Sequence, residues 1–303
     1  MDQAIVINKL SKKYRGSGTF AFHNLSLHVD AGEVYGFLGP NGAGKSTTIR
    51  TLLNFLQPTH GSASILGHDI AKEAVAVRRE IGYLAGDGAV YLKMNGHQYL
   101  EYLGELQPPT SQAFKQELTK RLQANLTKPL GELSRGNRQK ISIIQAFMHQ
   151  PRVMILDEPS SGLDPLMQEV FYELVAEAKG RGAAIFMSSH ILGEVQKVCD
   201  RVGIIRGGKL IIERTIAEMA KEAAQTFDLI FKDNAPLSKL KQLSGVQKVV
   251  QNDSHSVTLH VQGELSPLFE LLAKYTVTNI DTRALDLEEA FMHYYQAKGG
   301  SDA

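Results

Sequence analysis

The stretch of sequence that decides the fold reads Gly39-Pro40-Asn41-Gly42-Ala43-Gly44-Lys45-Ser46-Thr47, and it fits the pattern G-x-x-x-x-G-K-[ST]. The apolar run at residues 33–38 predicts a buried strand before it, and residues 47–55 predict a helix after it. Between a strand and a helix, the glycines allow consecutive backbone N–H groups to surround a phosphate group, and the helix N-terminus adds positive potential. A glycine-rich turn with no ligand is the alternative, which the flanking strand and helix make the weaker interpretation.

This pattern also assigns roles to individual side chains. We expect all nine residues of the loop to contact a nucleoside triphosphate. Lys45 is predicted to reach its outer phosphates, and the Ser46 hydroxyl group is predicted to bind Mg²⁺.

A pair of acidic residues follows a second apolar run, in the stretch Val153-Met154-Ile155-Leu156-Asp157-Glu158-Pro159. A strand buried on both faces would deliver Asp157 to the carboxyl edge of a parallel sheet, beside the phosphate loop. We therefore expect Asp157 to hold Mg²⁺ through water, and Glu158 to orient or deprotonate the attacking water. Two acids that merely end a strand are the alternative.

Composition limits the other classes of function. With 303 residues, 43% hydrophobic and 21% charged, the chain can hold one large α/β domain and a smaller companion. The net charge of +1 argues against a nucleic-acid partner bound through bulk electrostatics. The single cysteine, Cys199, excludes an intrachain disulfide and fits a reducing cytosol. No apolar stretch approaches the roughly 20 residues of a membrane-spanning helix, and the first residues predict no signal peptide.

The first domain is predicted to span residues 1–221. Antiparallel strands at residues 4–10 and 20–29 precede the phosphate loop, and an inserted helical subdomain is expected at about residues 94–150. Strands then alternate with helices, which is typical of a parallel sheet covered by helices. These later elements are predicted at residues 152–156, 166–179, 183–187, 191–198 and 202–205.

A second, smaller α+β domain is predicted at residues 222–303. Its elements follow the order β-α-β-β-α-β, which is that of ferredoxin-like folds, and a last helix is predicted at residues 287–296. The strands are expected at residues 227–231, 246–251, 257–261 and 277–282, and the helices at residues 236–243 and 267–275.

A second anion site is predicted where a helix begins at Leu133-Ser134-Arg135-Gly136-Asn137-Arg138-Gln139, with Ser134 as its N-cap. Here the chain resembles the ATP-binding cassette (ABC) ATPases, which are P-loop proteins whose signature reads LSGGQ. The sequence departs from that signature at Arg135 and Asn137. In the family, the signature of one subunit closes on ATP held by the phosphate loop of the other, so the resemblance implies that Ser134 and Gly136 bind ATP within a dimer.

Other motifs of that family match in the same order. Ser161-Gly162-Leu163-Asp164 resembles the D-loop, which crosses the dimer interface. His190 resembles the switch histidine that contacts the γ-phosphate, and Tyr14 resembles the aromatic residue that stacks on adenine. A structural histidine and an ordinary strand-end aromatic residue are the alternatives.

The position of the family's Q-loop glutamine is where this sequence departs most. Members of the family place that glutamine after a strand like Ile81-Gly82-Tyr83-Leu84, and here Gly86 stands in its place. We hypothesise that Asp87 substitutes for it through a water-mediated contact. The alternative is that the change loosens the coupling to the transport partner.

The resemblance covers nearly the whole chain, and residues from about 222 onward resemble the C-terminal extension of bacterial ABC-2-type exporter ATPases. It implies an ATPase subunit that uses ATP and Mg²⁺, with Lys45, Glu158 and His190 as catalytic residues. It also implies a homodimer on the cytoplasmic face of the cell membrane, a separate membrane permease and no nucleic-acid partner. Two alternatives stay open: a soluble ABC-type ATPase that acts on ribosomes or DNA, and a scaffold that binds ATP in a heterodimer without hydrolysing it.

Overall fold

The computed structural model describes residues 2–86, 91–222 and 225–283. The chain divides into two compact units, residues 1–213 and 214–303. The division lies slightly before the boundary expected at residue 221, so helix α8 (Ile216–Glu222) groups with the second unit. Each unit has a hydrophobic core of its own.

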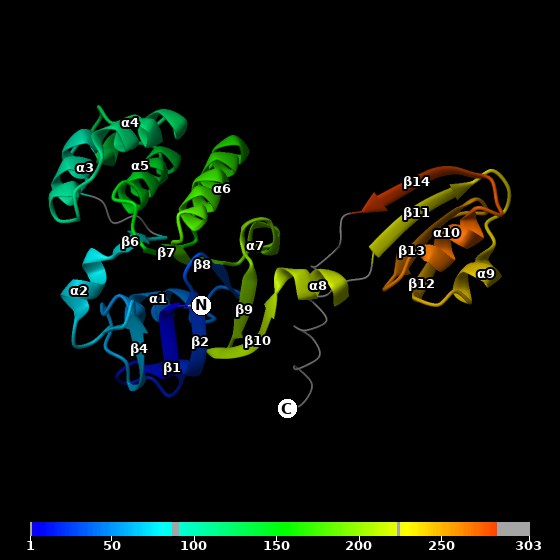
Figure 1. The fold of residues 1–303 in the computed structure, drawn as a ribbon, viewed down its shortest axis with the longest axis horizontal. Helices are drawn as coiled ribbons and strands as arrows, with labels where there is room; N and C mark the ends of the chain where they lie inside the picture. The colour runs from blue at the N-terminus through cyan, green and yellow to red at the C-terminus, as the bar shows by residue number, and fades with distance from the viewer. Residues whose placement is uncertain (1, 87–90, 223–224, 284–303) are drawn as a thin grey trace. The chain divides into compact units, whose positions relative to one another are not determined.

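A six-stranded sheet forms the centre of the first unit (Figure 1). Its strand order is β10-β9-β3-β8-β7-β6, and the five strands from β9 to β6 run parallel, as the sequence predicts. Strands β3, β7 and β8 are buried at every residue, so both of their faces are covered and their sequences read as nearly continuous apolar runs. The strand bounds are β3 Val34–Leu38, β6 Ile81–Leu84, β7 Val153–Asp157, β8 Ala184–Ser189, β9 Arg201–Arg206 and β10 Lys209–Thr215.

A four-stranded antiparallel sheet packs on one side of this core. Its order is β2-β1-β4-β5, and Ile5 and Ile7 of β1 lie opposite Val29 and Leu27 of β2, all four being buried. Their hydrophobic core continues into helix α1 (Lys45–Leu52) and the core sheet, so the segment between β3 and α1 is fixed by packing on both sides. The bounds are β1 Gln3–Lys13, β2 Phe20–Asp30, β4 His60–Ile65 and β5 His68–Asp69.

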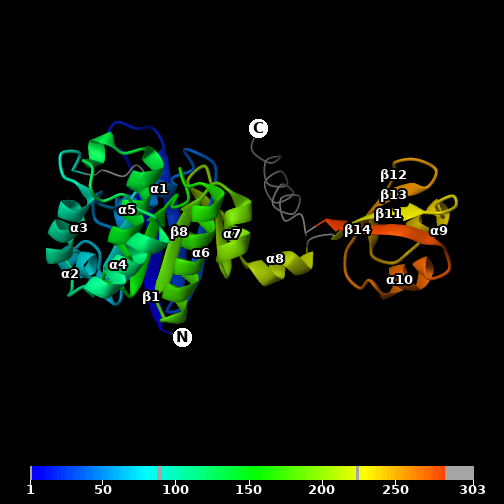
Figure 2. The same cartoon turned by 90° about the horizontal axis from the view of Figure 1, so that it is seen from above.

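Helices cover the opposite side of the core sheet (Figures 1 and 2). Helices α6 (Pro165–Gly180) and α7 (Leu192–Val198) both pack against β8, and α7 also packs against β3. Close approach of α7 requires glycine at position 36, because a Cβ atom there would lie 2.7 Å from the side chain of Val195 and 2.9 Å from that of Cys199.

The predicted helical subdomain at residues 94–150 is confirmed. It contains α3 (Gly96–Glu105), α4 (Gln112–Arg121), a short 3₁₀ turn and α5 (Arg135–Phe147), and α5 packs against both α3 and α4. Arg121 of α4 forms ion pairs with Glu173 and Glu177 of α6, which link the subdomain to the helices of the core. The short helix α2 (Ala74–Arg79), which the sequence pattern did not predict, precedes the subdomain.

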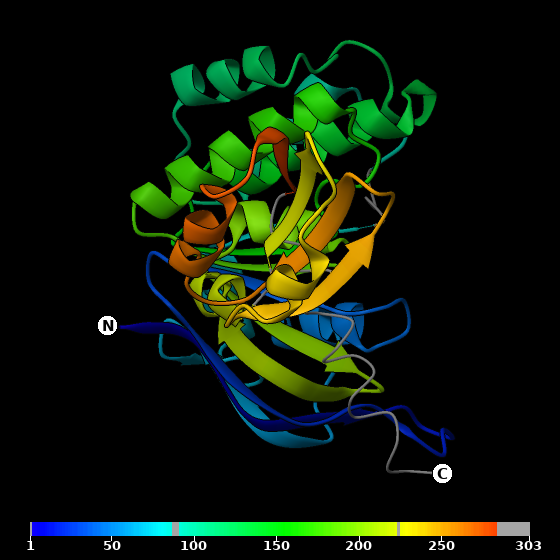
Figure 3. The ribbon, with the colours of Figure 1, turned by 90° about the vertical axis from the view of Figure 1, so that its right-hand side faces the viewer.

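After α8, the described residues of the second unit form a four-stranded antiparallel sheet and the helices α9 and α10 (Figure 3). Its elements follow the order β-α-β-β-α-β, and the spatial order of the strands is β12-β13-β11-β14. Leu240 of α9 and Leu268 of α10 pack with Phe227 and Leu229 of β11 in its core. The helix predicted at residues 287–296 lies outside the described residues. The bounds are β11 Gln225–Phe231, α9 Leu237–Lys241, β12 Val246–Gln251, β13 Ser256–Val261, α10 Ser266–Leu272 and β14 Val277–Arg283.

Within the described ranges, no helix is long and apolar enough to cross a membrane.

Candidate nucleotide-binding and hydrolysis site

The phosphate loop joins β3 to α1, as the sequence predicts, and its geometry depends on Gly44. This residue is the N-cap of α1 and has a φ of 109°, a left-handed value that side-chain-bearing residues rarely adopt. A Cβ atom at this position would also lie 2.5 Å from the carbonyl oxygen of Ala21. Because no side chain caps the start of α1, the N–H groups of its first turn are available to bind an anion above the loop.

A cavity of about 320 Å³ lies over this loop. Tyr14, from the connection between β1 and β2, reaches it: its hydroxyl group is 3.3 Å from Oγ1 of Thr47, and its side chain is 43% exposed. The cavity thus brings Tyr14 together with the phosphate loop and with Glu158. Its lining residues are Tyr14, Ala21, Asn41, Gly42, Gly44, Lys45, Ser46, Thr47 and Glu158.

The three expected catalytic residues meet at one carboxylate oxygen. Oε1 of Glu158 lies 3.5 Å from Nζ of Lys45 and 3.2 Å from Nδ1 of His190. Lys45 is only 5% exposed, and its ammonium group also donates hydrogen bonds to the carbonyl oxygens of Gly39 at 2.8 Å and Pro40 at 3.2 Å. A buried cation, a carboxylate and an imidazole are therefore assembled where the phosphate loop meets the carboxyl ends of β7 and β8.

Asp157 ends strand β7 and is 6% exposed. Its Oδ1 accepts a hydrogen bond of 2.5 Å from the hydroxyl group of Ser188, which lies opposite Asp157 in the parallel register of β7 and β8. The next residue, Glu158, has a φ of 47°, so the chain turns sharply there and the two carboxylates separate. The strand end therefore presents one carboxylate fixed by the sheet and a second in the turn.

A second cavity, of about 190 Å³, contains both Ser46 and Asp157. One hydroxyl group and one carboxylate form a donor set that suits Mg²⁺, which binds few protein ligands and keeps water and phosphate oxygens. In the described part of the chain, no cluster of three or more His, Cys, Asp or Glu side chains could hold a metal ion. Burial, together with repulsion by Asp157, raises the pKa of Tyr83 to about 12, so this residue lines the cavity as a neutral phenol. The lining residues are Ser46, Arg50, Tyr83, Ala85, Gly86, Arg135, Asp157, Glu158 and Ser161.

Gly86, at the position of the family's Q-loop glutamine, lies directly beside Asp157. A Cβ atom at Gly86 would lie 3.1 Å from the carbonyl oxygen of Asp157 and 3.6 Å from its Oδ2. A side chain at position 86 would therefore start next to the carboxylate of Asp157. Asp87, which we expected to substitute for the glutamine, lies outside the described residues.

Ser134 and Gly136 do not line the cavity over the phosphate loop of their own chain. They lie at the start of α5, where Ser134 is the predicted N-cap: its hydroxyl group accepts a hydrogen bond of 3.2 Å from the N–H of Asn137. Gly136 approaches the D-loop so closely that a Cβ atom would lie 2.8 Å from the carbonyl oxygen of Gly162. Arg135 donates a hydrogen bond of 2.8 Å to the hydroxyl group of Ser161 in the same loop. The signature therefore packs on the D-loop of its own chain.

Four buried polar residues support this site and did not stand out in the sequence. Ser188 holds Asp157, and Gln139 of α5 donates a hydrogen bond of 2.7 Å to the carbonyl oxygen of Pro159. The remaining two, Ser160 and Glu194, are each 4% exposed. Glu194 lies on α7, four residues after His190, and no signal in the sequence singled it out.

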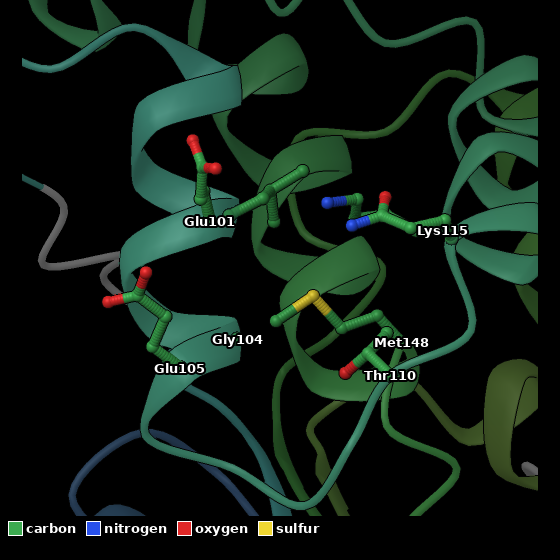
Figure 4. Close-up of a pocket in the computed structure, with 8 residues that line it drawn as sticks. Glu101, Gly104, Glu105, Thr110, Lys115 and Met148 are labelled. Atoms are coloured by element: carbon green, nitrogen blue, oxygen red, sulfur yellow. The ribbon is translucent and has the colours of Figure 1, made fainter.

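A third cavity, of about 270 Å³, lies apart from these motifs in the helical subdomain (Figure 4). Glu101 and Glu105 line it from α3, Lys115 lines it from α4, and Met148 lies between them. None of its lining residues belongs to the phosphate loop, the signature or the two strand-end acids.

Comparison with known proteins identifies the family. The model of the family described as ABC transporter matches residues 22–161. The chain is 30% identical to the daunorubicin resistance ATP-binding protein DrrA3 of Streptomyces coeruleorubidus, over 96% of each chain. It is 34% identical to the bacitracin transport ATP-binding protein BcrA of Bacillus licheniformis, over 89% of this chain and 90% of that protein.

A solved structure shows the same fold. The ATP-binding subunit of an ABC transporter superposes with a TM-score of 0.67 and 28% identity, over 72% of this chain and 92% of that chain. The resemblance found in the motifs and the predicted α/β fold of the first unit are thereby confirmed. The chain belongs to the ABC transporter family and is one of its ATP-binding subunits.

Proposed function

We propose that this chain hydrolyses ATP at a site completed by a second copy of itself, and that hydrolysis drives a separate membrane permease, in the direction of export. The observation that carries the proposal is the meeting of Lys45, Glu158 and His190 at one carboxylate oxygen beside the phosphate loop.

Binding of ATP would rest on the phosphate loop, residues 39–47. Its backbone N–H groups and Lys45 bind the phosphates, because the start of α1 concentrates unpaired donors and positive potential at one place. The exposed ring of Tyr14 stands at the same cavity and stacks on the adenine.

Ser46 and Asp157 would hold Mg²⁺, with Asp157 acting through a water molecule. When bound, Mg²⁺ offsets the negative charge that accumulates on the phosphate oxygens during the reaction. Ser188 keeps the Asp157 carboxylate in one orientation for this role.

Glu158 is the base in this proposal. Its carboxylate accepts a proton from the attacking water as that water forms a bond to the γ-phosphorus and the bond to the bridging oxygen breaks. His190 binds the γ-phosphate from the end of β8, and Lys45 binds it from the loop. Positioned charge, rather than a covalent intermediate, would supply the rate enhancement.

A second copy would supply Ser134 and Gly136. These residues do not line the cavity over the phosphate loop of their own chain, which supports a contact with the γ-phosphate across an interface, as in the family. The bacitracin transport relative and the daunorubicin resistance relative support the role in transport, since their names describe ATP-binding proteins of transport and of drug resistance. We place the working subunit on the cytoplasmic face of the membrane and treat residues from about 222 onward as an accessory domain that stabilises the dimer.

The decisive experiment is Glu158→Gln in the full chain, with Glu169→Gln as the matched control. Glu169 forms an ion pair with Lys197 in which both side chains are about half exposed, and neither residue lines the nucleotide cavities. We expect Glu158→Gln to bind ATP, to release phosphate at least about 100 times more slowly than the control, and to accumulate as a dimer in ATP. Phosphate release at the rate of the control would refute the role of Glu158.

A scaffold that binds ATP without hydrolysing it is the second candidate, favoured by Gly86 at the Q-loop position and by Arg135 in the signature. Measurement of phosphate release by the unmodified chain separates the two, because a scaffold would bind ATP and release none.

A further inference from the structure

Glu194 is a buried carboxyl group with no role in the site described so far. It lies in the first turn of α7, is 4% exposed, and its Oε1 has no hydrogen-bond partner among the residues that the structure describes. Burial raises its pKa, while the hydroxyl groups of Ser189 and Ser160 and the positive charge of His190 act in the opposite direction. Burying a carboxyl group costs free energy, and Glu194 lies only four residues after His190, so we look for a role of this residue beyond packing.

On one side, Glu194 holds the backbone that carries His190. Its Oε2 accepts a hydrogen bond of 2.6 Å from the hydroxyl group of Ser189, and that hydroxyl oxygen accepts a hydrogen bond of 3.0 Å from the N–H of Ile191. The residues on both sides of His190 are thereby fixed. The imidazole itself is 44% exposed, so packing does not determine its position. The backbone anchor therefore fixes the point from which the His190 side chain reaches Glu158.

On the other side, Glu194 reaches the segment that follows Glu158. The hydroxyl group of Ser160, two residues after Glu158, interacts with the same carboxyl group and lowers its pKa. Ser160 is buried, and its carbonyl oxygen accepts a hydrogen bond of 3.1 Å from the N–H of Leu163, so it forms part of the turn of the D-loop. The carboxyl group of Glu194 therefore lies near the turn of the D-loop, while its hydrogen bond is made to Ser189.

We propose that Glu194 is a positioning residue for ATP hydrolysis: through Ser189 it fixes the backbone on both sides of His190, and thereby the place of His190 relative to the carboxylate of Glu158. This inference rests on the proposed function, because it concerns the geometry of that same reaction. Glu194 touches neither the phosphate loop nor the cavity over it, so its effect falls on turnover and not on the binding of ATP.

The test compares Ser189→Ala, Glu194→Ala and their double variant with Glu169→Gln in the full chain. We expect each single variant to lower kcat on the order of ten- to a hundredfold, since each removes a hydrogen bond to a charged acceptor, while KM for ATP stays within about threefold. The double variant should lose little more than either single variant, because both act through one hydrogen bond. The conservative variant Glu194→Gln retains an acceptor for Ser189 and should keep kcat within about threefold of the unmodified chain.

Several outcomes would overturn the inference. The first is a kcat for Ser189→Ala equal to that of the control. The second is a loss of kcat in the double variant that equals the product of the two single losses. The third is a rise in KM for ATP in a single variant that matches the fall in its kcat. If Glu194→Ala fails to fold, Ser189→Ala and Glu194→Gln still decide the question. Glu158→Gln is measured in parallel. If Glu158→Gln is inactive while the Ser189 and Glu194 variants turn over normally, only the inference about Glu194 fails. If Glu158→Gln itself turns over normally, the proposed function fails instead.

Discussion

Replacement of Ser188 by alanine tests the metal site most directly. Ser188 is fully buried, and its hydroxyl group makes two hydrogen bonds: it donates to Oδ1 of Asp157 at 2.5 Å and accepts from the N–H of Glu158 at 3.2 Å. The second bond is replaceable, because the same N–H also donates to the carbonyl oxygen of Ser188 at 3.1 Å. The variant Ser188→Ala therefore removes one charge-assisted hydrogen bond from the carboxylate expected to hold Mg²⁺.

The magnitude follows from that single bond. A hydrogen bond to a charged group contributes about 1.5–3 kcal/mol, which corresponds to about ten- to a hundredfold in an equilibrium or rate constant. Asp157 is only 6% exposed, so water can replace the lost donor only in part. We expect Ser188→Ala to raise the Mg²⁺ concentration for half-maximal ATPase activity by about tenfold or more, and to lower kcat at saturating Mg²⁺ by less.

The assay is phosphate release as a function of Mg²⁺ concentration at fixed ATP, with Ser142→Ala as the matched control. Ser142 is also buried, at 5% exposure, but its hydroxyl group donates only to the carbonyl oxygen of Arg138 within α5. Its removal should leave the Mg²⁺ dependence unchanged. If the two serine variants have the same Mg²⁺ dependence, the reasoning that places Asp157 at the metal and Ser188 behind it is wrong.

Three further predictions concern other parts of the chain. Tyr14→Ala should raise KM for ATP by about two- to tenfold with little change in kcat, whereas Tyr14→Phe should behave like the unmodified chain; equal KM values for the two variants would exclude stacking. Gly136→Ala should lower kcat at least about tenfold, because the added Cβ atom would lie 2.8 Å from the carbonyl oxygen of Gly162, while the affinity for ATP measured by calorimetry should not change. Unchanged turnover would show that the close contact of residues 136 and 162 is not required. Burial lowers the pKa of His149 in the folded chain below the ordinary histidine pKa of about 6.5. The unfolded chain therefore binds more protons than the folded chain once the pH falls below about 6.5, and the folded state loses stability from that pH downward. Thermal unfolding between pH 8 and pH 5.5 should accordingly show a smaller loss of stability for His149→Gln, and parallel curves for the two proteins would contradict this.

The parts of the fold that local patterns determine could be predicted from the sequence. The phosphate loop, the buried strands on either side of it and the capped start of α5 each follow from a short run of residues. Strand β10 was not predicted. The turn signal Gly207-Gly208 precedes it, but its apolar residues are only half-buried and do not alternate clearly with polar ones. Helix α2 has six residues and no side-chain cap, so it carries no recognisable helix signal.

The supporting residues of the site depend on register and could not be predicted in this way. Ser188 reaches Asp157 only because β7 and β8 pair with these two residues opposite each other. Glu194 belongs to the helix predicted at residues 191–198, and it is buried only because α7 packs against the sheet. Sequence spacing places a residue along its element, whereas the contact of Ser188 with Asp157 joins two strands across 31 residues of sequence.

The shared carboxylate of Glu158 has a consequence for how the nucleotide enters. An ammonium group has three N–H donors, and those of Lys45 face two backbone carbonyl oxygens and Glu158. The contact with Glu158 is the longest of the three, so we expect an incoming phosphate oxygen to replace the carboxylate of Glu158 at Lys45 and to free that carboxylate for its proposed role as base. Removing the charge of Glu158 also removes this internal competitor. If a Glu158→Gln variant binds ATP more tightly, part of that gain would arise because Glu158 no longer competes with the phosphate for Lys45, and not because hydrolysis has stopped. The affinity of the variant for a non-hydrolysable ATP analogue, compared with that of the unmodified chain, measures this part.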